Sequence, residues 1–239
     1  MRPALLLAAL PLGLAACGGD DAAPLTVSAA SSLQGALTAC AGDVRLQFAG
    51  SDQLAAQIRQ GAPVDVLAAA SMRIPEELAG EGELEAAVPF ASNRLVLAVP
   101  TGSPIDGLDA LAAGGVSLVV GAEGVPVGDY TRTVLGNLPA AQRDAILAAV
   151  RSEEPDVKGV VGKLVQGAAD AGFVYATDVE SAGGELRAIE LPAELEPVAI
   201  YAAGVVSGSE RRGDAEAFVG GLVDGPCHEA LLDAGFGPP

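Results

Sequence analysis

The spacing of apolar residues along this chain switches between the pattern of short buried strands and the pattern of amphipathic helices. Apolar runs at 25–29, 43–48 and 64–69 predict strands, and the intervening segments 32–41 and 51–60 carry apolar residues at helical spacing. Strands that alternate with helices are typical of βαβ units with a mostly parallel sheet. The first part of the chain is therefore predicted to be an α/β structure.

The same alternation continues to the end of the chain. The further predicted elements are helices at 74–80, 107–113, 128–136, 140–150, 156–168, 213–223 and 226–233, and strands at 93–100, 116–120, 171–175, 186–191 and 197–206. This number of elements predicts two α/β lobes of roughly 100 residues each. Open α/β sheets bind ligands at the carboxyl ends of their strands, so a cleft between two such lobes is the expected binding site.

The first residues have the organisation of an export signal. Arg2 precedes an apolar run that is too short for a confident membrane span, and the run closes on Leu-Ala-Ala-Cys before the polar segment GGDDAAP. This resembles the bacterial lipobox, in which the cysteine is lipidated and becomes the first residue of the mature chain. We expect a signal peptide at 1–16, lipidation of Cys17 and a flexible tether at 17–24. An ordinary secretory signal with an incidental cysteine is the alternative.

The two remaining cysteines suggest how the chain ends are joined. Cys40 and Cys227 form an even pair in an oxidising compartment, at the end of the first predicted helix and the start of the last one. A disulfide between them would stabilise the fold by roughly 4–5 kcal/mol, although free buried thiols or a nucleophile are alternatives. With the ends tied together, lobe I would consist of residues 25–97 plus 198–239, and lobe II of residues 98–197.

Charge and motifs argue against two large classes of function. The net charge of −18, from 13 Lys and Arg against 31 Asp and Glu, disfavours nucleic-acid binding, which depends on basic side chains. The chain contains one His and lacks the GxSxG, HExxH and CxxC motifs, so neither catalysis nor a metal site is supported. We expect no enzyme activity and no cofactor.

A strand or turn delivers small or hydroxyl residues to a helix start at four places. These places are Ser31-Ser32, Gly50-Ser51, Val127-Gly128 and Asp156-Val157. Each helix start has amides without intrahelical partners and a partial positive charge, which together favour an anion. A serine at such a place can also be a simple N-cap. Four such places in one exported two-lobe chain favour an anion site.

These segments resemble the periplasmic molybdate-binding proteins of ABC transporters. VSAASSLQGAL is similar to their AAASL segment, and QFAGSDQLAAQIRQGAPVDVLAAAS is similar to their second signature. GVPVGDYTRTVL resembles their VPxGxY turn, and DVKGVVGKLVQGAADAGFVYATD resembles their fourth block. The match runs in order over nearly the whole mature chain. It implies a two-lobe periplasmic-binding-protein fold of type II. The tie between the first and last helices places the two hinge crossovers of such a fold near residues 98 and 197.

The resemblance also implies a ligand and a partner. The expected ligand is molybdate, and also tungstate, held by neutral donors and delivered to the membrane permease of an ABC importer. The protein is expected to be a monomer on the outer face of the cytoplasmic membrane, attached to it only through the lipid on Cys17. The alternatives are another tetrahedral oxyanion such as sulfate, or a secreted lipoprotein enzyme that uses Ser51 or Cys40.

The resemblance assigns individual donors as well. The residues implied to bind the oxyanion are Ser32, Ser51, Val127, Val157 and Tyr175. Ser31 stands where the family usually has Ala, so we expect it to support the site without direct contact. Asp52 and Asp129 depart from the small residues of the family and are expected to point away from the cleft. Replacing Ser51 by Ala is expected to weaken binding by roughly 1–3 kcal/mol and to leave the stability of the free protein nearly unchanged.

Overall fold

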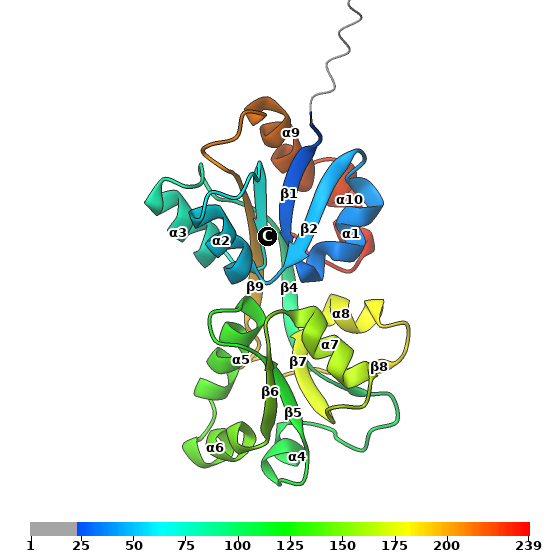
Figure 1. Cartoon of the computed structure of the whole chain (residues 1–239). Helices are drawn as coiled ribbons and strands as arrows, with labels where there is room; N and C mark the ends of the chain where they lie inside the picture. The colour runs from blue at the N-terminus through cyan, green and yellow to red at the C-terminus, as the bar shows by residue number, and fades with distance from the viewer. Residues whose placement is uncertain (1–22) are drawn as a thin grey trace, which may run out of the picture.

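A computed structural model describes residues 23–239, which form two α/β lobes joined by two adjacent strands (Figure 1). The expected signal peptide at 1–16, the lipidation of Cys17 and most of the tether at 17–24 lie outside the described residues. Within the range 23–239, no helix has both the length and the apolar character needed to cross a bilayer.

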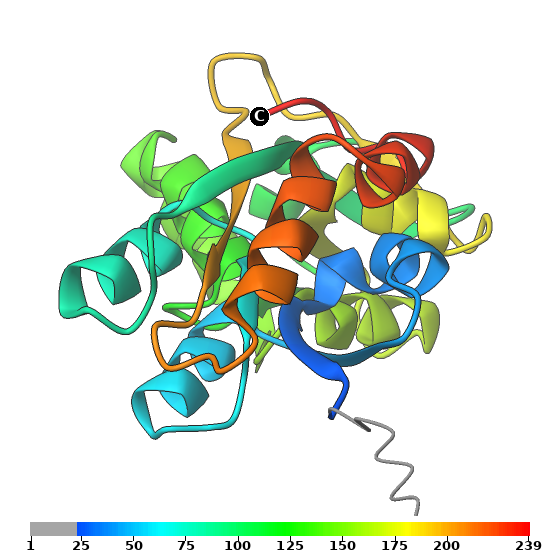
Figure 2. The same cartoon turned by 90° about the horizontal axis from the view of Figure 1, so that it is seen from above.

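Lobe I is built around a parallel three-stranded unit. Strand β1 (Leu25–Ala30) lies between β2 (Val44–Ala49) and β3 (Val66–Ala69), and both pairings are parallel. The helical elements of the lobe are η1 (Ser31–Leu33), α1 (Gln34–Cys40), α2 (Ser51–Arg59), α3 (Arg73–Glu81), α9 (Arg212–Val223) and α10 (Pro226–Asp233). Figure 2 shows α2 and α3 on the opposite side of this lobe from α1 and α10. Because helices cover the sheet, every residue of β1 is buried.

Lobe II repeats this arrangement. Strand β5 (Leu118–Gly121) pairs in parallel with β6 (Val150–Glu154) and with β7 (Ala171–Tyr175). Strand β8 (Leu186–Ile189) pairs antiparallel with residues 97–100. The helices of the lobe are α4 (Leu108–Ala112), α5 (Pro126–Gly136), α6 (Ala140–Ala148), α7 (Val157–Val165) and α8 (Ala176–Ser181).

Two neighbouring strands connect the lobes. The first part of β4 (Val88–Pro100) pairs antiparallel with β9 (Val198–Val205), which in turn pairs with β3 of lobe I. From Leu95 onwards, β4 pairs instead with β7 and β8 of lobe II. The mostly parallel sheets of the two lobes are therefore joined through β4 and β9. The exact lobe limits given above stay a prediction.

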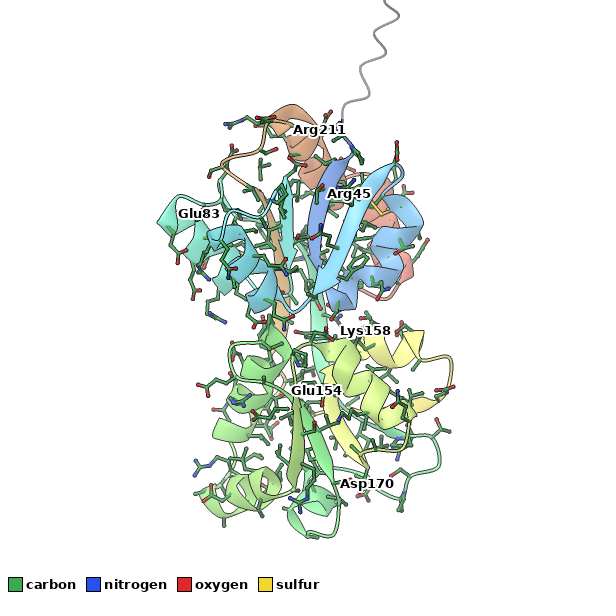
Figure 3. All side chains as sticks on the ribbon, viewed as in Figure 1. Arg45, Glu83, Glu154, Lys158, Asp170 and Arg211 are labelled. Carbon is green, nitrogen blue, oxygen red and sulfur yellow. A yellow bond between two sulfur atoms is a disulfide. The ribbon has the colours of Figure 1, made fainter. Side chains whose placement is uncertain are left out.

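The ends of the described chain are fixed to each other in lobe I. A disulfide joins Cys40, the last residue of α1, to Cys227 in the first turn of α10. The bond is visible in yellow in Figure 3. The predicted disulfide is thus confirmed, and the alternatives of free thiols or a nucleophilic Cys40 are excluded for this structure. The C-terminal helices complete the lobe that begins the chain.

Most predicted elements match the observed ones to within a few residues. Strand β4 begins earlier than predicted, at Val88 instead of residue 93. Two elements were not predicted. Strand β6 has the sequence VRSEE, whose charged residues conceal its alternation, and α8 has only six residues and follows β7 without a break.

Candidate functional site

The four predicted helix starts meet in one cavity between the lobes. From lobe I it is bounded by η1 and the start of α2, and from lobe II by the starts of α5 and α7. The residues predicted from the sequence all line it: Ser31, Ser32, Ser51, Val127, Val157 and Tyr175. Each of these residues lies at the carboxyl end of a parallel strand or shortly after it. The carboxyl ends of parallel strands lie at the same edge of each sheet.

This cavity is small and has an uncharged lining. Its volume is about 10 Å³, and no Lys, Arg, Asp or Glu side chain lines it. Such a volume holds about one water molecule, so a larger ion can enter only if the lobes move apart. Among residues 23–239, no group of three or more His, Cys, Asp or Glu side chains is arranged to hold a metal ion. The cavity therefore offers hydrogen-bond donors and helix dipoles instead of formal charges.

The serine hydroxyls are not N-caps, contrary to one expectation from the sequence. Neither η1 nor α2 has a side-chain cap at its start. The Ser32 hydroxyl lies 2.9 Å from the phenol oxygen of Tyr201 on β9. The Ser51 hydroxyl accepts a hydrogen bond of 3.1 Å from the backbone amide of Ala70. Because Ser51 accepts from the protein, its own hydrogen is free to be donated into the cavity.

Tyr175 supplies a further donor. Its side chain is 1% exposed, and its hydroxyl has no hydrogen-bond partner among the described residues. Burial raises the pKa of this phenol well above its ordinary value, so the hydroxyl stays protonated. A buried phenol that lacks a protein partner and faces a cavity is suited to donate to a ligand.

The two helix starts of lobe II present backbone amides. In α5, Pro126 occupies the first helical position and has no N–H, so Val127 provides the first free amide. The next position requires glycine, because a Cβ at Gly128 would lie 2.1 Å from the carbonyl oxygen of Ala122. In α7, the Asp156 side chain caps the helix by accepting from the Gly159 amide at 2.9 Å. That cap leaves the Val157 amide, one position into the helix, for the cavity.

The two acidic residues that depart from the family pattern do not line the cavity. The Asp129 carboxylate accepts hydrogen bonds from the Gly124 amide at 2.9 Å and from the Arg73 guanidinium at 2.8 Å. Arg73 belongs to α3 of lobe I, so this ion pair bridges the lobes and holds the Asp129 charge away from the site. Asp52 lies in the first turn of α2, where a carboxylate suits the helix dipole.

Two sets of contacts were not predicted from the sequence, those of Arg73 across the lobes and that of Tyr201 with Ser32. Arg73 gave no signal, because a single Arg at the start of a helix is common. Tyr201 did give one, since it stands inside the otherwise apolar strand VAIYAAGV. A phenol that is fully buried in such a strand needs a hydrogen-bond partner.

Comparison with known proteins agrees with this geometry. The family model for bacterial extracellular solute-binding proteins matches residues 25–237. The molybdate-binding protein ModA of Mycobacterium tuberculosis is 31% identical over 258 residues, which cover 98% of this chain and 97% of that protein. The protein of the same name from Haemophilus influenzae is 28% identical over 254 residues, with 98% and 95% covered.

Solved structures share the fold. The substrate-binding domain of a putative molybdenum ABC transporter from Clostridium difficile has a TM-score of 0.65 and 26% identity, covering 90% of this chain and 99% of that one. The periplasmic molybdate-binding protein of Azotobacter vinelandii has a TM-score of 0.79 at 21% identity, with the same coverage. The chain described here belongs to the family of bacterial extracellular solute-binding proteins, in which its relatives include the molybdate-binding proteins of ABC transporters.

Proposed function

We propose that this protein binds molybdate, and also tungstate, in the cavity between the lobes and delivers it to the membrane permease of an ABC importer. The observation that supports this most directly is that all the predicted donors line one uncharged cavity. Members of this family are solute-binding proteins and not enzymes. We also propose that residues 25–97 with 198–239 and residues 98–197 are the two bodies that close on the ligand.

Each proposed contact provides a donor to the ligand. The hydroxyls of Ser32, Ser51 and Tyr175 and the backbone amides of Val127 and Val157 would surround the anion, and Ser31 would support them. A fully deprotonated tetrahedral dianion accepts hydrogen bonds at every oxygen. A protonated oxyanion such as hydrogen phosphate needs an acceptor, and this site would leave its proton unpaired.

The cellular location follows in part from the family, whose members are exported. We propose in addition that Cys17 carries a lipid that holds the protein, as a monomer, on the outer face of the cytoplasmic membrane. The support is the sequence Leu-Ala-Ala-Cys after an apolar run. Loss of membrane attachment in a Cys17→Ser variant is the corresponding test.

Calorimetry with molybdate, tungstate, sulfate and phosphate tests the proposed ligand. Molybdate and tungstate should bind, and at a concentration 100 times Kd they should stabilise the fold by about 2.7 kcal/mol. For a chain of this size, that corresponds to a rise in Tm of about 5–10 °C. If sulfate binds and molybdate does not, the protein serves another tetrahedral oxyanion.

Replacing Ser51 by Ala should weaken molybdate binding by roughly 1–3 kcal/mol, because a donor to the anion is lost. The stability of the free variant, which the sequence predicted to be nearly unchanged, is expected to differ in view of the structure. The buried amide of Ala70 would lose its acceptor, so the free variant should also be less stable, by about 1–3 kcal/mol. Titration calorimetry well below Tm and melting of the free variant measure the two effects separately. Unchanged affinity would mean that Ser51 serves only the Ala70 amide.

A further inference from the structure

The Ser32 hydroxyl is engaged by a side chain that lies far away in the sequence. Its oxygen is 2.9 Å from the phenol oxygen of Tyr201, and both side chains are buried. Ser32 belongs to η1 of lobe I, whereas Tyr201 lies on β9, one of the two strands that connect the lobes. A hydroxyl has one hydrogen to donate, so the direction of this bond decides what Ser32 can offer to a ligand.

The burial of Tyr201 indicates that direction. Its side chain is fully buried and does not line the cavity, whereas Ser32 does. Among the described residues, the structure gives the Tyr201 phenol no acceptor other than the Ser32 oxygen. If Ser32 donated this bond, the phenol hydrogen would be buried without an acceptor, whereas the Ser32 hydrogen can be donated to a ligand in the cavity. The phenol hydrogen is therefore directed to Ser32.

We infer that Tyr201 is a positioning residue of the oxyanion site, which makes the Ser32 hydroxyl a fixed donor to the cavity by donating to its oxygen. This inference rests on the proposed function. Ser51 is held in the same way, because its oxygen accepts from the Ala70 amide. Both serines thus direct their hydrogens toward the cavity, where a fully deprotonated oxyanion accepts from both and the hydrogen of hydrogen phosphate would oppose another hydrogen. Tyr201 thereby contributes to selection of fully deprotonated oxyanions.

The geometry around Tyr201 allows a conservative test. Its ring packs edge-on against Phe90, Tyr175 and Phe236, with centroid distances of 6.2, 5.8 and 5.3 Å. A Tyr201→Phe variant keeps these contacts and removes only the hydroxyl. It should bind molybdate about ten times more weakly than the unaltered protein. The ratio of its Kd for phosphate to its Kd for molybdate should also decrease.

A double-mutant cycle distinguishes positioning from a general structural effect. In a Ser32→Ala background, Tyr201→Phe should change the molybdate Kd by less than twofold, because the group through which it acts is absent. Tyr130→Phe is the matched control, since it also removes a phenol whose ring packs edge-on against Tyr175, with ring centroids 6.4 Å apart, but Ser32 bonds to Tyr201 and not to Tyr130. Molybdate affinity of this control should stay within twofold of the unaltered protein.

The outcomes separate the two proposals. If Tyr201→Phe weakens binding equally with and without Ser32, or has no effect on either background, the positioning role is wrong. If the unaltered protein does not bind molybdate in calorimetry, the proposed function itself fails. Melting of each free variant confirms that affinities are compared between folded proteins.

Discussion

A variant with both Cys40 and Cys227 replaced by Ser is expected to lose about 5 kcal/mol of the free energy of unfolding. The disulfide closes a loop across a sequence separation of 187 residues, which includes β4, all of lobe II and β9. The chain-entropy model assigns its greatest effect to such long loops, because the cross-link restricts the unfolded chain most strongly. The corresponding fall in Tm is roughly 10–20 °C for a chain of this size, measurable by calorimetry.

Chemical reduction of the unaltered protein provides the control. It should lower Tm as the double replacement does, since both treatments remove the same bond. Neither cysteine lines the cavity between the lobes, so molybdate affinity below the melting range should stay within about twofold. Equal unfolding free energies for the reduced and oxidised proteins would show that packing of α10 on α1 holds the chain ends without the bond.

The Gly50→Ala variant is expected to bind molybdate on the order of a hundred times more weakly. A Cβ at Gly50 would lie 2.3 Å from the carbonyl oxygen of Pro155, which precedes α7 in lobe II. It would also lie 2.7 Å from a carboxylate oxygen of Asp52, a side chain that can rotate away, whereas the backbone of Pro155 cannot. The lobes must therefore separate, by about 1 Å, and the donors of lobe II move away from the anion.

The expected loss of molybdate affinity arises because the lobes cannot close fully, and not because the variant folds less stably. The backbone of Gly50 has φ −61° and ψ 139°, which an alanine adopts without strain. The free variant should accordingly melt within a few degrees of the unaltered protein. Gly162→Ala is the control, because nothing lies within 4 Å of a Cβ at that position. If Gly50→Ala binds molybdate as tightly as this control, the close approach of the lobes at Gly50 is not needed for binding.

The sequence was sufficient to predict most of the elements, with β6 and α8 as exceptions, and to predict that four helix starts meet at one cavity. Alternation of buried strands with amphipathic helices fixes an α/β architecture, and such an architecture brings the ends of parallel strands to one edge. For this reason, Ser32, Ser51, Val127 and Val157 could be grouped before their positions were known. The disulfide was predictable because one leading cysteine stands in the proposed lipobox and two others remain.

Side-chain hydrogen bonding could not be predicted from the same pattern. A serine at a helix start is usually an N-cap, yet Ser32 bonds to Tyr201 and Ser51 accepts from Ala70. Tyr201 lies on β9 and Ala70 directly follows β3, both distant in sequence from their serines, and local spacing carries no information about such contacts. The pairing of Arg73 with Asp129 across the lobes was hidden for the same reason.

The antiparallel pairing of β4 with β9 has a mechanical consequence. Cross-strand hydrogen bonds between Ala91–Arg94 and Val198–Tyr201 prevent either strand from sliding along the other. A two-stranded ribbon bends and twists more readily than it shears, so the lobes move relative to each other by rotation and not by sliding. Rotation about this one ribbon brings the donors of the two lobes together without a change of register between the strands. The conformational entropy lost on capture of the ligand is correspondingly small.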